Sequence, residues 1–237
     1  MNIKQDVEGL YTERTQFSER LYELMGSIQY RLNAVDWHLR NLCQQHNYYE
    51  QKIAKNGLES SGWSEQYSLY YLFDDFIFNL ISLYDYFGSY IYLSFVDQNK
   101  QKKMWSRLAN AAGNQNNYFS NCILAKKIFK HHREWVIKLN DYRAQIIHYK
   151  LNHGHAKKRI SISVKEGIQK TELMYSVPDD LVKLLNLQNC HKNETGFDLQ
   201  FGAIEIAERS IVSLKELAQT ALDRCTLNSI QFKEKLL

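Results

Sequence analysis

The chain has 237 residues and is 44% hydrophobic, so it can bury a sizeable core in one large domain or two small ones. One proline and ten glycines are too few turn-forming residues for an all-β sandwich or barrel, and they favour long helices. The net charge of +4 is only mildly basic, so a nucleic-acid-binding surface would require local clustering of charge.

The four cysteines show no Cys-x-x-Cys spacing, which argues against a zinc ribbon or a redox motif. Scattered cysteines are typical of the reducing cytosol, where they behave as small buried apolar groups. The N-terminal sequence MNIKQDVEGLYTER lacks the apolar run of a signal peptide. We therefore expect a cytoplasmic protein, and no motif indicates a cofactor.

One or two helices are predicted over residues 3–47, because apolar residues recur there at helical spacing. A turn-rich loop follows over residues 56–62. The segment 66–96 is then apolar on nearly every side, which fits either a transmembrane helix or a core helix covered by its neighbours. We favour the core helix and expect no membrane partner, because Asp85 near the bilayer centre would cost about 3 kcal/mol.

Polar residues of this segment recur at spacings of four and three, which places them on one stripe of a helix. They are Asp75, Asn79, Ser82, Asp85 and Ser89. One interpretation is a solvent-facing strip, and the other is a polar seam in the core that receives a partner such as Arg143. The first is favoured, because carboxylates are rarely buried without a paired charge.

A long amphipathic helix of about 30 residues is predicted over 119–151, since its apolar positions alternate in steps of four and three. These positions are Ile128, His132, Trp135, Leu139, Tyr142, Ile146 and Tyr149. The first half is basic, and Asn152 and Gly154 are stop signals.

Alternating apolar and polar residues predict a β-hairpin over about 159–177, directly after this helix. Helices are expected over 178–225, the first of them opened by Pro178. With no internal repeat and no low-complexity linker, residues 1–237 are expected to form a single all-α domain, a helical bundle with one small hairpin.

The end of the 119–151 helix combines Arg143 and His148 with a basic run, and no acidic residue occurs between Tyr142 and Lys165. Arginine binds phosphate through bidentate hydrogen bonds, and histidine exchanges protons near neutral pH. Such a pair suits metal-independent RNA cleavage, in which arginine stabilises the transition state. DNA lacks the 2′-hydroxyl that this reaction requires.

The neighbouring residues supply the expected substrate contacts and support for the pair. The substrate-binding candidates are Lys150, His153, His155, Lys157, Lys158 and Arg159, and the supporting candidates are Asp85, Asp75 and Tyr149. Two alternatives remain: a structural Arg143 paired with an aspartate of the apolar helix, and a metal site built on His148, His153 and His155. The second is disfavoured because no carboxylate or cysteine lies nearby, so no metal is expected.

On one continuous helix, Arg143 and His148 point about 140° apart and lie about 7.5 Å apart along the axis. A single straight helix would therefore not direct both side chains at one phosphate. Either the helix breaks between them, or the long side chains converge around its end, or two copies meet across a cleft. We favour the last, a homodimer in which two pairs meet at a shared cleft.

The Arg143-Ala-Gln-Ile-Ile-His148 motif, with FIFNLISLYDYFG upstream, resembles the two central helices of the HEPN superfamily over residues 66–150. The resemblance implies an all-helical dimer, an RNA substrate, catalysis by Arg143 and His148, and a role in antiphage defence or with a cognate antitoxin. The alternative is a silent HEPN-like module that binds RNA, a nucleotide or a partner protein. That alternative is based on Ala144, where active members often carry a polar residue, and on Lys150, where some carry a tyrosine.

Overall fold

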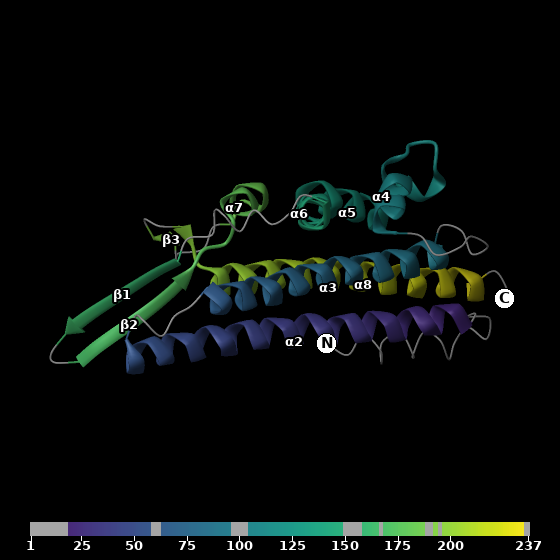
Figure 1. Ribbon diagram of the computed structural model, residues 1–237. Helices are drawn as coiled ribbons and strands as arrows, with labels where there is room; N and C mark the ends of the chain where they lie inside the picture. Colours follow the sequence, from purple (N-terminus) through teal and green to yellow (C-terminus); the bar gives the residue numbers. More distant parts are fainter. Residues whose placement is uncertain are drawn as a thin grey trace. The chain divides into compact units, whose positions relative to one another are not determined.

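The computed structural model describes residues 19–57, 63–95, 104–148, 158–165, 168–187, 192–193 and 196–234. These residues form an all-α helical bundle with a β-hairpin, as the sequence predicts (Figure 1). The long helices are α2 (Glu19–Asn56), α3 (Trp63–Phe95) and α8 (Leu199–Glu234). The shorter helices are α4 (Trp105–Gly113), α5 (Ile123–His131), α6 (Ile137–His148) and α7 (Asp179–Leu185).

The described residues divide into two compact units. Unit 1 takes its residues from 1–32, 81–137 and 209–237, and unit 2 takes its residues from 33–80 and 138–208. Helices α2, α3 and α8 each contribute residues to both units. The expectation of a single domain stays a prediction.

The first half of α3 lies in the core of unit 2, and many of its apolar side chains are inaccessible to solvent. The fully buried residues are Leu69, Tyr70, Phe73, Phe76, Ile77 and Leu80. Among the described side chains of this half, the exposed ones are Ser64, Tyr67, Tyr71 and Asp75. The interpretation of 66–96 as a core helix is therefore confirmed for this half, and among the described helices none is long and apolar enough to cross a membrane.

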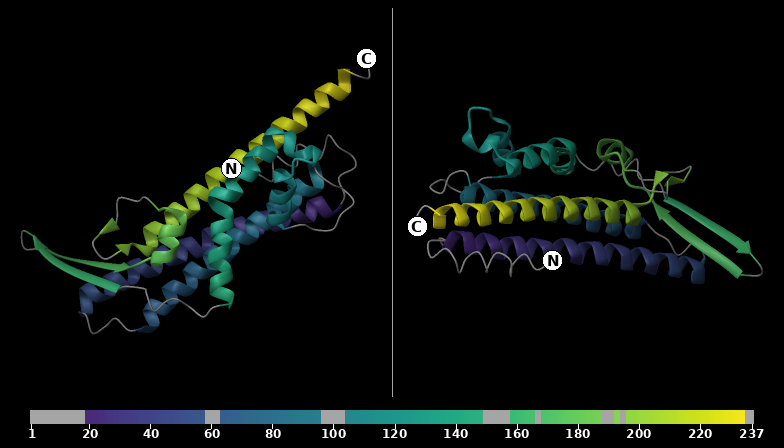
Figure 2. Two further views of the ribbon diagram at one scale, coloured as in Figure 1. Left: turned by 90° about the horizontal axis from the view of Figure 1, so that it is seen from above. Right: turned by 180° about the vertical axis from the view of Figure 1, so that it is seen from behind.

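The predicted hairpin is confirmed as β1 (Lys158–Lys165) paired antiparallel with β2 (Ile168–Tyr175). The two strands lie side by side in both views of Figure 2. The C-terminal end of β2 enters the core of unit 2, since Tyr175 is fully buried and the Tyr70 hydroxyl donates to the Ser176 carbonyl at 2.8 Å. Ile162 and Val164, farther along the hairpin, are exposed. Two very short strands, β3 (Lys192–Asn193) and β4 (Gly196–Phe197), pair just before α8.

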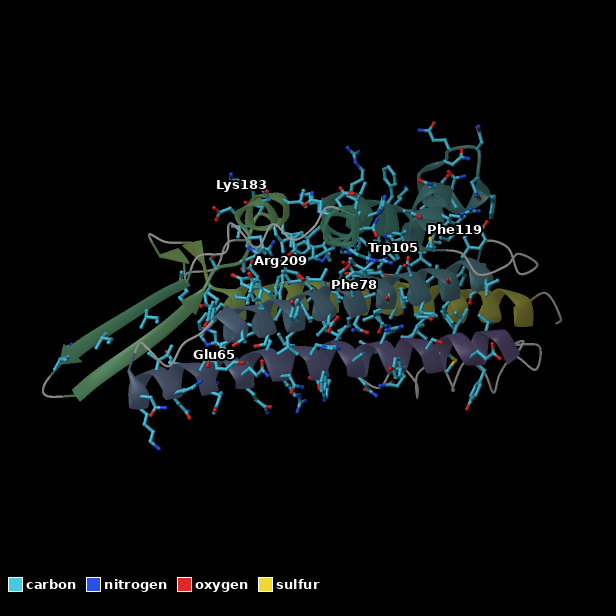
Figure 3. All side chains as sticks on the ribbon, in the orientation of Figure 1. Glu65, Phe78, Trp105, Phe119, Lys183 and Arg209 are labelled. Carbon is cyan, nitrogen blue, oxygen red and sulfur yellow. The ribbon has the colours of Figure 1, made fainter. Side chains whose placement is uncertain are left out.

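Unit 1 is held together by buried aromatic residues with polar contacts. The Trp105 indole, at the start of α4, donates to His132 Nδ1, and the Trp135 indole donates to Ser210 Oγ at 2.9 Å. Trp105 also packs so closely on Gly88 of α3 that a Cβ there would lie 2.9 Å from the Trp105 Cα (Trp105 is labelled in Figure 3). A glycine is therefore required at this helix crossing.

The helix predicted over 119–151 begins later, at Ile123, and runs to His148 with a π-helical segment inside it. A short 3-10 helix, η2 (Tyr118–Asn121), precedes α5, and a π-helical segment, η3 (His132–Val136), separates α5 from α6. This wider turn carries both His132 and Trp135, the two residues that bond to Trp105 and Ser210. The periodicity of apolar residues did not predict the π turn. Such a turn contains one residue more than an α turn, and the spacing of apolar residues across it remains nearly the same.

Candidate functional site

Arg143 lies in α6 and contacts α3 within unit 2. Its guanidinium carbon is 5.7 Å from the centre of the Phe78 ring, and the side chain is half-buried. Phe78 is labelled on α3 in Figure 3. A guanidinium over an aromatic face is stabilised electrostatically, more strongly when partly desolvated. The aromatic ring therefore helps to fix the position of this cation.

The residue before Arg143 belongs to the same contact between α6 and α3. The Tyr142 hydroxyl donates to Asp74 Oδ1 at 3.5 Å, and both side chains are buried. Burial, together with the nearby Asp74 carboxylate, raises the pKa of Tyr142 well above its ordinary value. The phenol is thus kept neutral and acts as a hydrogen-bond donor to a buried acid.

Asp74 and Phe78 are one helical turn apart, so α3 presents a carboxylate and a ring to two consecutive residues of α6. Sequence reasoning missed Asp74 as a site residue. The available signal was an aspartate inside an apolar helix, opposite a tyrosine directly before the motif arginine. That signal is weak, because it requires knowing which helices are neighbours.

The backbone places Arg143 and His148 in the same uninterrupted helix, and His148 is the last residue of it that the structure describes. The π segment ends before this helix begins, so no irregular turn separates the two motif residues. At about 100° per residue, their Cα–Cβ directions differ by about 140°. The side chain of His148 lies outside the described part of the structure.

The supporting aspartates have different surroundings. Asp75 is exposed on α3, and its charge acts on His38 of α2, whose pKa is lowered by burial and raised in part by Asp75. Asp85, in unit 1, accepts a hydrogen bond of 3.0 Å from the backbone N–H of Trp105. Ser89 is fully buried and bonds to the Asp85 carbonyl of its own helix. The polar stripe is therefore neither a solvent strip nor a buried seam along its whole length.

The expected basic contacts fall largely outside the described residues, namely Lys150, His153, His155 and Lys157, as does the supporting Tyr149. Lys158 and Arg159 form the start of β1, and their side chains are not described. Among the described residues, no group of three or more His, Cys, Asp or Glu side chains is arranged to hold a metal ion.

A second buried polar cluster in unit 2 was not predicted from the sequence. His46 Nε2 lies 3.8 Å from Asp198 Oδ2, and both side chains are almost fully buried. Asp198 also caps α8, because its Oδ1 accepts the backbone N–H groups of Gln200 and Phe201. Cys43, one turn before His46, has its pKa raised mainly by burial. A thiol held in its protonated form is a poor nucleophile, so this cluster is better explained as a structural connection between α2 and α8.

Another charged contact joins the start of α3 to α2. The Lys52 ammonium donates to Glu65 Oε1, and the Tyr49 hydroxyl lies 2.8 Å from Ser68 Oγ. Glu65, labelled in Figure 3, is buried. Because such a pair loses hydration on folding, it adds little net stability, and it connects the start of α3 to α2.

Comparison of the chain with family models, with curated proteins and with solved structures gives no match.

Proposed function

We propose that the protein is a metal-independent endoribonuclease of the HEPN type, with Arg143 and His148 as its catalytic pair. Two features support this: the all-α fold, and the order of a strongly apolar α3 before an α6 that carries the motif. The observation that carries the proposal is the half-buried guanidinium of Arg143 over the Phe78 ring of α3. Positioning of a permanent positive charge is the main requirement for phosphoryl chemistry without a metal.

In this mechanism the RNA supplies its own nucleophile. His148 takes the proton of the 2′-hydroxyl or gives a proton to the leaving 5′-oxygen, and Arg143 stabilises charge on the pentacoordinate phosphorus. The products carry a 2′,3′-cyclic phosphate and a free 5′-hydroxyl. The basic residues after the motif neutralise neighbouring phosphates of the RNA.

A homodimer completes the site in this proposal. Because the two motif residues diverge by about 140° on α6, Arg143 and His148 approach one phosphate most simply when two copies contribute to one cleft. The biological setting is antiphage defence or toxin–antitoxin regulation in the cytoplasm, with a cognate antitoxin or another protein partner controlling activity.

A catalytically silent HEPN-like module, binding RNA, a nucleotide or a partner protein, is the second candidate. The uninterrupted helical course of α6 favours it, since one copy alone does not aim the two side chains together. Ala144, half-buried directly after the arginine, also favours it, because an apolar residue adds no polar contact there.

Cleavage of single-stranded and structured RNA in EDTA separates the two candidates. The first predicts cyclic-phosphate ends that disappear in Arg143→Ala and His148→Ala, with Arg40→Ala as the control. Arg40 is exposed and pairs at 2.9 Å with Asp36 of its own helix. Its substitution therefore removes one positive charge at a position outside the candidate site.

Absence of cleavage by a folded wild-type chain that still binds RNA would support the silent module instead. Light scattering tests the composite cleft separately. A chain that stays monomeric at concentrations where it cleaves RNA would overturn the dimer.

A further inference from the structure

The segment that forms α4, η2 and α5 in unit 1 has an uneven charge distribution. Residues 104–133 contain no aspartate and no glutamate, and their cationic residues are Arg107, Lys126, Lys127, Lys130 and Arg133. The three elements pack against one another, with α4 and α5 next to each other in Figure 1. This part of unit 1 therefore carries several cations and no carboxylate of its own, although Glu216 of α8 and Asp85 of α3 contact it.

One face of α5 gathers most of that charge. Lys126, Phe129 and Lys130 of α5 follow the spacing of a single helix face, Arg133 continues it in the adjoining segment η3, and all four are exposed. The opposite side is buried through Leu124, Ala125 and Ile128. We call these four exposed residues the α5 basic face.

The remaining cations of α5 are already engaged. Lys127 pairs with Glu216 of α8 at 3.0 Å, and His131 contacts the same carboxylate. By contrast, Lys126, Lys130 and Arg133 make no ion pair with any other described residue. The charge of the α5 basic face is thus not neutralised within the described chain.

Exposed aromatic and amide groups lie on α5 and on the segments that pack against it. Arg133 lies over the Phe129 ring at 5.8 Å, and the same ring covers Gly113, where a Cβ would come within 2.5 Å of Phe129 Cε2. The exposed amides of Asn114, Gln115 and Asn116 follow directly after Gly113. Tyr118, in η2, is 88% exposed, which leaves its ring faces accessible.

We propose that single-stranded RNA docks on the α5 basic face, with phosphates on Lys126, Lys130 and Arg133 and an unpaired base on Tyr118. Unneutralised cations match a polyanion, and an exposed aromatic ring with neighbouring amides matches unstacked bases rather than a duplex. The RNA identity rests on the proposed function, but docking here does not require Arg143 or His148.

Fluorescence anisotropy with a labelled single-stranded RNA of about 12 nucleotides tests the proposal, using His148→Ala protein in EDTA so that the RNA stays intact. Lys126→Ala/Lys130→Ala/Arg133→Ala should weaken binding at least about tenfold and lower the slope of log K against log salt by about 2. The matched control, Arg40→Ala/Lys55→Ala/Lys183→Ala, removes three exposed cations elsewhere and should change Kd by less than about twofold.

Tyr118 provides a second variant that does not change the charge. Tyr118→Ala should weaken binding about fivefold or more, while Tyr118→Phe, which keeps the ring, should bind like the parent protein. Circular dichroism and urea unfolding of each variant confirm that the fold is retained.

Several outcomes overturn the proposal. Equal losses in the two triple variants would show that only net charge matters. Tighter binding to duplex RNA, or to vesicles containing phosphatidylserine, would assign the face to another partner.

The outcome also separates this proposal from the proposed function. Charge-dependent RNA binding by a chain that never cleaves RNA would uphold docking and reject catalysis. If the α5 triple variant cleaves RNA at the wild-type rate at low RNA concentration, catalysis would be upheld and docking on the α5 basic face rejected.

Discussion

Two arginine–phenylalanine contacts occur in neighbouring stretches of the chain and have different surroundings. Arg143 and Phe78 come from different helices, and the arginine is half-buried in unit 2. Arg133 and Phe129 are one turn apart in unit 1, and both are exposed. The geometry is nearly the same, 5.7 and 5.8 Å, but the first contact joins two elements and the second presents a cation to solvent. A cation–π contact therefore indicates a role only when burial and connectivity are considered with it.

The largest expected difference between the two arginines is in catalysis. If the proposed function holds, Arg143→Ala should lower kcat for RNA cleavage by about 10²-fold or more, because the proposed mechanism uses this charge to stabilise the transition state. Arg133→Ala should raise KM and leave kcat at saturating RNA within about twofold, because docking contributes equally to ground and transition states. Steady-state kinetics distinguish these patterns. An Arg143→Ala enzyme with wild-type kcat would reject the catalytic assignment.

The two phenylalanines should differ in stability. Phe78→Ala removes a ring between α3 and α6 and should lower the free energy of unfolding by about 2–3 kcal/mol. Phe129→Ala removes a ring that is 38% exposed and should cost about 1 kcal/mol or less. Urea denaturation of both variants measures the difference. Equal costs would mean that the exposed ring is as important to packing as the half-buried one.

Alkaline pH should weaken the α3–α6 contact through Tyr142. Its folded-state pKa is raised by burial and by Asp74, so the stabilisation is complete below the unfolded pKa of about 10 and is lost above it. In Tyr142→Phe, unfolding stability should fall less steeply between about pH 10 and 11, by up to about 1.4 kcal/mol per pH unit. Denaturation curves at several pH values test this. An unchanged slope would contradict a buried neutral phenol at this position.

The smallest effect is expected at Glu216 in unit 1. Its pKa is lowered by hydrogen bonds from Lys127 and His131, so its contribution is present above the unfolded pKa of about 4.3 and is lost as the pH falls. The carboxylate is 44% exposed, so Glu216→Gln should cost only about 0.5 kcal/mol at neutral pH and less in high salt. Thermal unfolding with and without added salt measures this. A cost above about 2 kcal/mol would mean that the pair is shielded from solvent.

The sequence predicted those features that depend on local patterns. The apolar run of α3, the alternation in β1 and β2, and the buried positions Ile128, Trp135, Leu139 and Tyr142 all follow from side-chain periodicity, and the structure confirms them. Each of these patterns extends over a few consecutive turns or residues, so neighbouring residues are sufficient to recognise it.

The candidate site was only partly accessible from the sequence. Arg143 was identified from its chemistry, but its contact with Phe78 and the neighbouring Asp74–Tyr142 hydrogen bond depend on which helices meet. The same holds for His46 and Asp198, which belong to α2 and the start of α8. The π segment was missed for a different reason, since an inserted residue changes the backbone without changing residue type.

The hydrogen bonds that close each unit join residues from distant parts of the chain. Tyr70 bonds to Ser176 over 106 residues in unit 2, and Tyr84 bonds to Ser210 over 126 residues in unit 1. During synthesis, α2 and α3 leave the ribosome well before these partners exist. Neither unit can complete its core until the segment around α8 has been made. The apolar side chains of the first half of α3 therefore stay exposed until their packing partners have been synthesised. We expect the nascent chain to depend on chaperones during that interval.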